Sequence, residues 1–231
     1  MSNTPIKLEF SEKYDQEHAQ RYLEKHKTGL ARRLSNYREQ QLARRALTLA
    51  DEPNLVLDLP CGAGRFWSTL AEQPNRIILA ADNSADMLAT AMAAQSKHIT
   101  KHVRTLQTSA FDINLPDNAV DSIFCMRLLH HIEKPEHRLT LLKEFHRTTR
   151  DSVIISLWVD GNYKAWRRNI SEKRRLQGDP CYKSNNRFLI SQKTIEQEFM
   201  QAGFTIQTHL DFIPGYSMWR VYILRKNKIK S

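Results

Sequence analysis

The sequence has few of the features that mark membrane-spanning, secreted or zinc-binding proteins. It contains no run near the roughly 18–20 uninterrupted apolar residues that a membrane-spanning helix needs. Residues 1–10 lack a basic start followed by an apolar stretch, so a secretory signal is not expected. Cys61, Cys125 and Cys181 form no C-x-x-C spacing, which argues against a disulfide framework and a cysteine-built zinc site. These absences predict a cytoplasmic protein.

Internal repeats, low-complexity segments and flexible linkers are also absent, so the sequence shows no sharp domain boundary. The 231 residues are 41% hydrophobic and 26% charged, which fits one large globular domain and excludes general disorder. We divide the chain into a helical N-terminal cap (residues 1–50) and a main domain (51–231) that carries a basic insertion (160–190).

Positive charge, in contrast, is in excess and unevenly distributed. The chain has 35 Lys and Arg residues against 25 Asp and Glu residues, a formal net charge of +10. Residues 20–45 hold eight basic and two acidic residues, and residues 160–190 hold eight basic and three acidic residues. Such segments favour an anionic substrate, nucleic acid or an acidic membrane surface, although two solvated helices of ordinary composition would give similar counts.

Short apolar runs alternate with helical patterns through the middle of the chain. Each run is rich in β-branched residues and apolar along its length, as in strands covered on both faces. Ser84 suits the N-cap of one intervening helix and Pro135 the first turn of another. This alternation predicts right-handed βαβ units and a parallel sheet. The runs are residues 55–59, 77–81, 103–107, 120–126 and 153–159.

The C-terminal part has a different pattern. Ser191 begins a helix that Gly203 ends, with Ile195, Phe199 and Met200 predicted to face inward. Two β-like runs follow, joined by a short turn, which predicts an antiparallel hairpin and a total of seven strands. These runs are residues 204–210 and 218–224.

A long amphipathic helix is predicted near the N-terminus, at residues 29–50. Apolar side chains recur there at a spacing of three to four residues, while several arginines occupy the opposite side. The residues predicted to face inward are Leu30, Leu34, Tyr37, Gln41 or Leu42, Ala46 and Leu49.

A glycine-containing turn follows the first predicted strand and leads into a helix, an arrangement that places a ligand at the carboxyl edge of a parallel sheet. The turn lacks the Gly-Lys-Ser/Thr of a phosphate-binding P-loop. A dinucleotide-binding turn has the motif G-x-G-x-x-G. When Gly62 and Gly64 are aligned with its first two glycines, Trp67 falls at the position of the third. Tryptophan cannot provide the close helix–strand contact of that glycine, so NAD and FAD are disfavoured.

An acidic residue at the end of this strand indicates another ligand class. Residues 58–64, Asp-Leu-Pro-Cys-Gly-Ala-Gly, resemble the first motif, D/E-x-G-x-G-x-G, of class I S-adenosylmethionine (SAM)-dependent methyltransferases. Proline replaces the first glycine and makes the turn stiffer. The resemblance implies a SAM-binding role for Asp58, Pro60, Cys61, Gly62 and Gly64, with Arg65 available to the SAM carboxylate.

Three further segments follow the order of the same family. Asp82 ends the strand at residues 77–81, where the family holds the ribose hydroxyls with a carboxylate that accepts both protons. Asn83 and Met87 match the continuation of that motif, D-x-S-x-x-M-L. The segment Ala110, Phe111 and Asp112 resembles the part that contacts adenine, and Leu-His-His-Ile at 129–132 resembles the UbiE-like (methyltransferase type 11) group.

The resemblance covers residues 54–160 and the terminal hairpin, and it implies both fold and cofactor. The expected fold is α/β: a Rossmann-like, seven-stranded, mostly parallel sheet with a C-terminal antiparallel hairpin, helices on both faces and a helical N-terminal lid. Residues 51–231 would form a SAM-binding methyltransferase domain, with SAM as donor and S-adenosylhomocysteine (SAH) as product. The alternative is a Rossmann-like core that has lost SAM binding.

Methyl transfer from a sulfonium needs mainly alignment with a nucleophile. An oxygen nucleophile benefits from a base, and imidazole titrates near pH ~6.5, so the adjacent His130 and His131 are candidates. We predict His130 as the catalytic residue, with structural packing of both histidines as the alternative. Arg127 is assigned to the cofactor site, where it could also meet an acidic acceptor. No metal site is predicted.

The resemblance leaves the methyl acceptor open. Both basic segments lie where these enzymes build a substrate lid, which predicts an anionic small-molecule, sugar or lipid acceptor, with O-methylation favoured. An RNA methyltransferase is the alternative, although no RNA-binding module is recognisable. A non-catalytic SAM-binding protein on the same fold is a further alternative.

Overall fold

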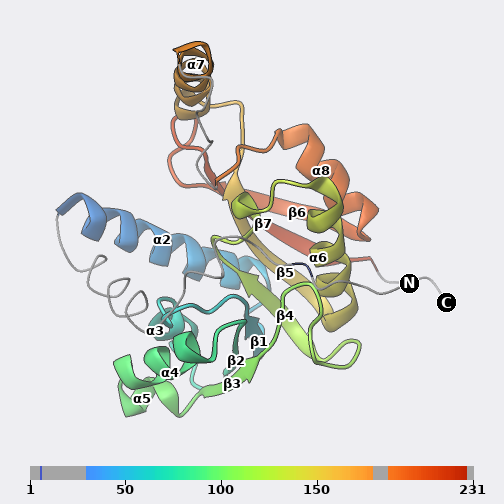
Figure 1. The fold of residues 1–231 in the computed structure, drawn as a ribbon. Helices are drawn as coiled ribbons and strands as arrows, with labels where there is room; N and C mark the ends of the chain where they lie inside the picture. Colours follow the sequence, from blue (N-terminus) through green and yellow to red (C-terminus); the bar gives the residue numbers. More distant parts are fainter. Residues whose placement is uncertain (1–5, 7–29, 179–186, 228–231) are drawn as a thin grey trace.

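The computed structural model describes residues 6, 30–178 and 187–227 (Figure 1). A seven-stranded sheet with the order β3-β2-β1-β4-β5-β7-β6 forms its centre. All neighbouring strands are parallel except at β7, which is antiparallel to both β5 and β6. The predicted fold class is confirmed. The strands are β1 (Leu55–Asp58), β2 (Ile77–Asp82), β3 (Val103–Gln107), β4 (Val120–Cys125), β5 (Thr149–Trp158), β6 (Phe204–Asp211) and β7 (Trp219–Lys226).

Helices cover both faces of the sheet and enclose two apolar cores. One core joins the sheet to α6 (Pro135–Thr148) and α8 (Gln192–Gln201). The other joins it to α2 (Leu30–Leu49), α3 (Trp67–Leu70) and α4 (Ala85–Ala94). The short α5 (Lys97–Thr100) precedes β3, a 3₁₀ turn η2 (Leu129–His131) follows β4, and α7 (Tyr163–Gly178) occupies the predicted insertion. None of the described helices is long and apolar enough to cross a membrane.

Local capping signals appear where the sequence predicts them. The Ser84 side chain accepts a hydrogen bond from the Met87 N–H at the start of α4. Pro135 lies in the first turn of α6, and Ser191 is the N-cap of α8. Gly203, which follows α8, has a φ of +91°, a value that favours glycine.

The predicted inward faces of two helices need correction. In α8, Ile195 and Phe199 are buried as predicted, but Met200 is 59% exposed, because it lies about 100° around the helix from Phe199. In α2, Leu34 and Tyr37 are exposed, whereas the second half packs on the sheet. A helix of 20 residues spans about 30 Å. The first half of α2 therefore extends beyond the part of the sheet against which the second half packs. The buried residues of α2 are Glu39, Leu42, Ala43, Ala46 and Leu47.

The division into residues 1–50 and 51–231 stays a prediction. Residues 7–29 of the cap lie outside the described residues, and the second half of α2 shares the core of the main domain. The other predicted segment, the basic insertion at 160–190, follows β5 and contains α7, while its residues 179–186 also lie outside the described part.

Candidate functional site

The glycine turn between β1 and α3 forms one wall of the site. Gly62 and Gly64 have φ values of +52° and +69°, in the left-handed region that side chains disfavour. Trp67 packs directly on Gly64, where an added Cβ would lie 2.8 Å from a ring carbon. Trp67, which occupies the third glycine position of a dinucleotide motif, therefore fixes the shape of this turn.

Asp58 lies beneath the turn and does not line the cavity described below. It is buried, and its Oδ2 accepts a hydrogen bond from the Trp67 Nε1 at 3.1 Å. Burial raises the pKa of Asp58 well above its usual range, while the Trp67 hydrogen bond acts in the opposite direction. Asp58 and Trp67 thus support the turn from below.

Asp82, at the end of β2, is held by the backbone on both oxygens. Its Oδ2 accepts the Gly62 N–H and its Oδ1 accepts the Ser84 N–H, each at 3.0 Å. Burial raises the pKa of Asp82, whereas backbone hydrogen bonds from Ser84, Gly62 and Asn83 lower it. Each oxygen keeps further acceptor capacity. The carboxylate is therefore oriented to receive two donors, as a vicinal diol would supply.

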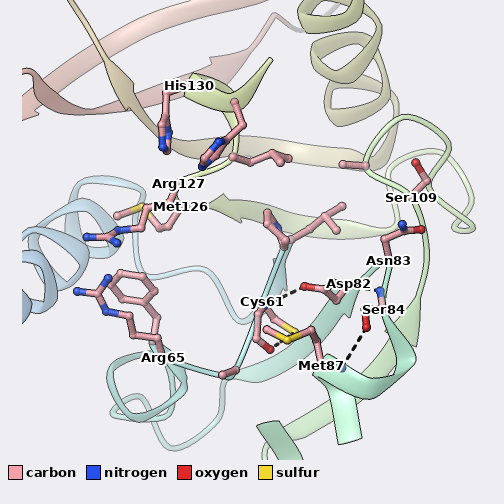
Figure 2. A pocket seen from close by; sticks show the side chains of 18 of the residues that line it. Cys61, Arg65, Asp82, Asn83, Ser84, Met87, Ser109, Met126, Arg127 and His130 are labelled. Atoms are coloured by element: carbon pink, nitrogen blue, oxygen red, sulfur yellow. Dashed lines mark hydrogen bonds between the residues drawn. The ribbon is translucent and has the colours of Figure 1, made fainter. Parts of the chain in front are cut away.

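These elements border a cavity of about 420 Å³ at the carboxyl edge of the sheet (Figure 2). In Figure 2, Asn83, Ser84 and Ser109 lie at one side of it, and Arg65 and Arg127 lie at the other. The volume suits a cofactor-sized ligand. Ten of the predicted cofactor residues line the cavity: Pro60, Cys61, Gly62, Arg65, Asp82, Asn83, Met87, Ala110, Phe111 and Arg127.

Three predicted cofactor residues do not line the cavity: Asp58, Gly64 and Asp112. Asp112 is exposed, and its main-chain carbonyl accepts a hydrogen bond from the Thr108 hydroxyl. Their direct contact with a cofactor stays a prediction. Trp219 and Arg187 also line the cavity. Arg187 belongs to the basic segment 160–190 that is predicted to build a substrate lid, whereas Trp219 lies in a distant segment without a local motif.

A buried carboxylate joins the two arginines at the cavity. Glu39 of α2 accepts hydrogen bonds from Arg127 Nη2 at 2.5 Å and from Arg127 Nε at 3.1 Å, and its Oε2 lies 3.0 Å from Arg65 Nη2. Arg65 Nε also donates to Asn36 Oδ1 at 2.9 Å. Glu39 thereby ties the middle of α2 to the glycine turn and to the end of β4.

His130 lies in an aromatic cluster with Trp158 and Trp219, which line the cavity beside it. Its ring is stacked on Trp158 at 5.0 Å between centroids and is edge-on to Trp219 at 4.8 Å. Burial, together with the charges of His131 and nearby arginines, lowers the pKa of His130 to about 2. The imidazole is therefore neutral. Within the part of the chain that the structure describes, His130 Nδ1 and Trp158 Nε1 are buried without a hydrogen-bond partner.

Arginines surround this aromatic cluster. The guanidinium carbons of Arg168 and Arg187 lie 5.0 Å and 5.7 Å from the centre of the Trp158 ring. That of Arg127 lies 5.2 Å from the Trp219 ring. Such cation–π contacts hold the arginines in place. Arg127 is also paired with Glu39 and Arg168 with Glu172, whereas Arg187 has no carboxylate partner among the described residues. This end of the cavity is therefore both apolar and positively charged.

Metal ligation is not indicated at this site. The described residues contain no group of three or more His, Cys, Asp and Glu side chains that could hold a metal ion.

Comparison with known proteins associates this geometry with one family. Residues 56–152 match the model of a methyltransferase domain. A curated relative, an uncharacterized protein of a Synechococcus strain, is 34% identical over 89 residues, which make up 38% of this chain and 21% of the relative. The chain thus spans about a fifth of that relative's length.

Solved methyltransferase structures share the fold at low sequence identity. Magnesium protoporphyrin IX methyltransferase from Synechocystis PCC 6803, with bound SAH, has a TM-score of 0.64 and 12% identity, covering 87% of this chain and 89% of its own. A SAM-dependent methyltransferase from Methanosarcina mazei gives 0.60 and 18%, covering 75% and 92%. Human N-acetylserotonin methyltransferase in complex with SAM gives 0.60 and 17%, covering 82% and 52%.

Proposed function

We propose that this chain, which by its domain and its fold is a class I SAM-dependent methyltransferase, transfers the methyl group of SAM to an anionic acceptor. The acceptor is a small molecule, a sugar or a lipid, and O-methylation is favoured. The observation that carries the SAM site of this proposal is the Asp82 carboxylate, which the N–H groups of Gly62 and Ser84 orient at the cavity.

The two sides of the cavity suit the two ends of SAM. Asp82 and Asn83 would hold the ribose, and Ala110 and Phe111 would border the adenine. The methionine end would lie along the glycine turn toward Arg65, whose positive charge suits a carboxylate. SAM supplies a methyl group on a positively charged sulfur, which is a good leaving group.

The aromatic end of the cavity would bind the acceptor. Arg127 and Arg187 supply positive charge there, and His130 Nδ1 is available for a hydrogen bond that orients the acceptor. A pKa of about 2 makes His130 a weak base near neutral pH. An acceptor whose nucleophilic oxygen is already anionic fits this site, because it attacks without losing a proton.

Titration calorimetry with SAM and, separately, SAH tests the donor site. We expect the Asp82→Ala variant to weaken both ligands at least tenfold, since a hydrogen bond to a charged group contributes about 1.5–3 kcal/mol. Asp86→Ala is the matched control, because Asp86 is exposed in the first turn of α4 and does not line the cavity. Equal affinities in the wild type and both variants would refute the proposed site.

Transfer of labelled methyl from SAM to a panel of carboxylate and phosphate compounds tests the acceptor class. An Arg187→Ala variant should keep its SAM affinity and lose transfer to the anionic compounds that the wild type methylates. Methylation of RNA, or tight SAM binding without transfer to any compound in the panel, would favour the alternatives.

A further inference from the structure

An exposed group of apolar side chains lies beside the acceptor end of the cavity. It consists of Tyr163, Trp166, Ile213 and Tyr216, which are 45%, 59%, 46% and 42% exposed. We call these four residues the aromatic patch. They make up half of the eight large apolar side chains that the described residues expose. A concentration of this kind on one surface marks an interaction site.

The patch is held together by the backbone and by ring contacts. The N–H groups of Tyr163 and Lys164 donate to the carbonyls of Gly215 and Tyr216, both at 3.0 Å. The rings of Tyr163 and Tyr216 stack at 5.6 Å with an interplanar angle of 13°, and Tyr163 lies 5.9 Å from Trp166. The start of α7 and the β6–β7 connection therefore form one surface.

Helix α7 carries one part of this surface. It projects from the body of the protein at the top of Figure 1. Ala165 is buried on its inner side, and Arg168 on the same helix contacts Trp158 at the cavity. Tyr163, Trp166 and the half-buried Ile170 follow at intervals of three and four residues, so they share one outer stripe.

Positive charge flanks the stripe. The sequence of α7 contains six basic residues and one acidic residue, Glu172, which is paired with Arg168 at 2.7 Å. Lys164, Arg167 and Lys173 are exposed, and the Lys164 ammonium lies 5.1 Å from the centre of the Tyr216 ring. The partner of this surface is therefore both anionic and able to receive apolar side chains.

We propose that the aromatic patch and the exposed basic residues of α7 dock onto an anionic lipid bilayer. Tryptophan and tyrosine favour the membrane–water interface, where their rings contact acyl chains and their polar atoms stay hydrated, and basic residues add attraction to anionic headgroups. Trp158 and Trp219, which line the cavity, lie five and three residues from the patch in sequence. Docking would place the acceptor end of the cavity near the bilayer surface.

The same residues are less suited to single-stranded nucleic acid. Bases bind such proteins by stacking on open aromatic faces. Here Tyr163 and Tyr216 stack on each other, and Lys164 covers Tyr216. The aliphatic Ile213 adds to the apolar surface without offering a stacking face. A bilayer accepts all four side chains of the patch.

Vesicle co-sedimentation of the full chain, without SAM, tests the proposal independently of methyl transfer. The probes are vesicles of phosphatidylcholine alone and of phosphatidylcholine with phosphatidylglycerol at about 3:1. We expect binding to the anionic vesicles that decreases with salt, and at least a tenfold loss of affinity in W166S/I213S and in K164E/R167E. L34S/Y37S is the matched control, because it removes two exposed apolar residues beside basic residues on α2. This control should bind as the wild type does.

Tryptophan fluorescence provides a second readout. Of the four tryptophans, only Trp166 is exposed, so brominated lipids should quench its emission and the quenching should disappear in W166F. The proposal is overturned by three results: no binding to anionic vesicles, equal binding to neutral vesicles, or equal loss of binding in L34S/Y37S. Binding of an RNA oligonucleotide through the patch, without vesicle binding, would also overturn it. Loss of SAM binding in D82A does not affect this test.

Discussion

Replacing Glu39 with glutamine removes a buried negative charge that joins Arg65 and Arg127. In the native protein the carboxylate bonds Arg127 through two nitrogen atoms at 2.5 and 3.1 Å and pairs with Arg65 at 3.0 Å. Glutamine keeps a single oxygen acceptor and presents an NH₂ group to guanidinium donors. The variant therefore loses charge-assisted hydrogen bonds and leaves two like charges close together.

The burial of the three side chains determines the size of the effect. Glu39 and Arg65 are only 7% and 12% exposed, whereas Arg127 is 30% exposed. Breaking a buried ion pair by removing one partner costs about 3–5 kcal/mol, and the partial exposure of Arg127 favours the lower limit, about 3 kcal/mol. Since 1 kcal/mol shifts the Tm of a chain of this size by about 2–4 °C, we expect Tm to fall by about 6–12 °C.

Thermal unfolding by circular dichroism measures this difference. Glu72→Gln is the matched control: Glu72 pairs with Arg44 of the same helix α2, but the two side chains are 47% and 45% exposed. Exposed pairs contribute less than about 1 kcal/mol, so Tm of this variant should change by no more than about 4 °C. Equal shifts in the two variants would show that Glu39 does not hold α2 at the cavity.

Two other substitutions test the burial of His130 and the glycine turn. Because the pKa of His130 is lowered to about 2, the folded protein does not bind the proton that the unfolded chain takes up below pH ~6.5. The free energy of unfolding should therefore fall as the pH is lowered, by about 1.4 kcal/mol per pH unit, or about 2 kcal/mol between pH 6.5 and 5. His130→Phe should remove this contribution in urea titrations at the two pH values, and an unchanged slope would contradict it. Gly64→Ala should lower the free energy of unfolding by about 3 kcal/mol, since both the positive φ and the Trp67 ring oppose a Cβ. Gly161→Ala is the control: only its positive φ opposes a Cβ, so it should cost about 1 kcal/mol. Equal costs in denaturant titrations would show that Trp67 does not pack on the turn as described.

Local sequence patterns were sufficient to predict the strands, the helix starts and the glycine turn at the carboxyl edge of the sheet. The predicted run 103–107 coincides with β3, and Ser84 caps α4. The glycine turn and Asp82 lie together at one edge because the carboxyl ends of neighbouring parallel strands meet there. Each of these features depends on residues close in sequence, so periodicity and turn chemistry reveal it.

The inward face of α2 depended on the tertiary structure. Apolar spacing predicted Leu34 and Tyr37 to be buried, yet the helix extends past the sheet and exposes both. Periodicity identifies an apolar stripe, but the length of helix that the sheet covers depends on how the two pack.

The aromatic end of the cavity, around His130, depended mainly on the fold. Glu39, Arg187 and Trp219 belong to segments far apart in the chain, and the hydrogen bond from Arg127 to Glu39 spans 88 residues. The low pKa of His130 likewise depends on burial against Trp158 and on nearby arginines. Contacts and desolvation of this kind arise only when distant segments pack together, so no local pattern in the sequence encodes them.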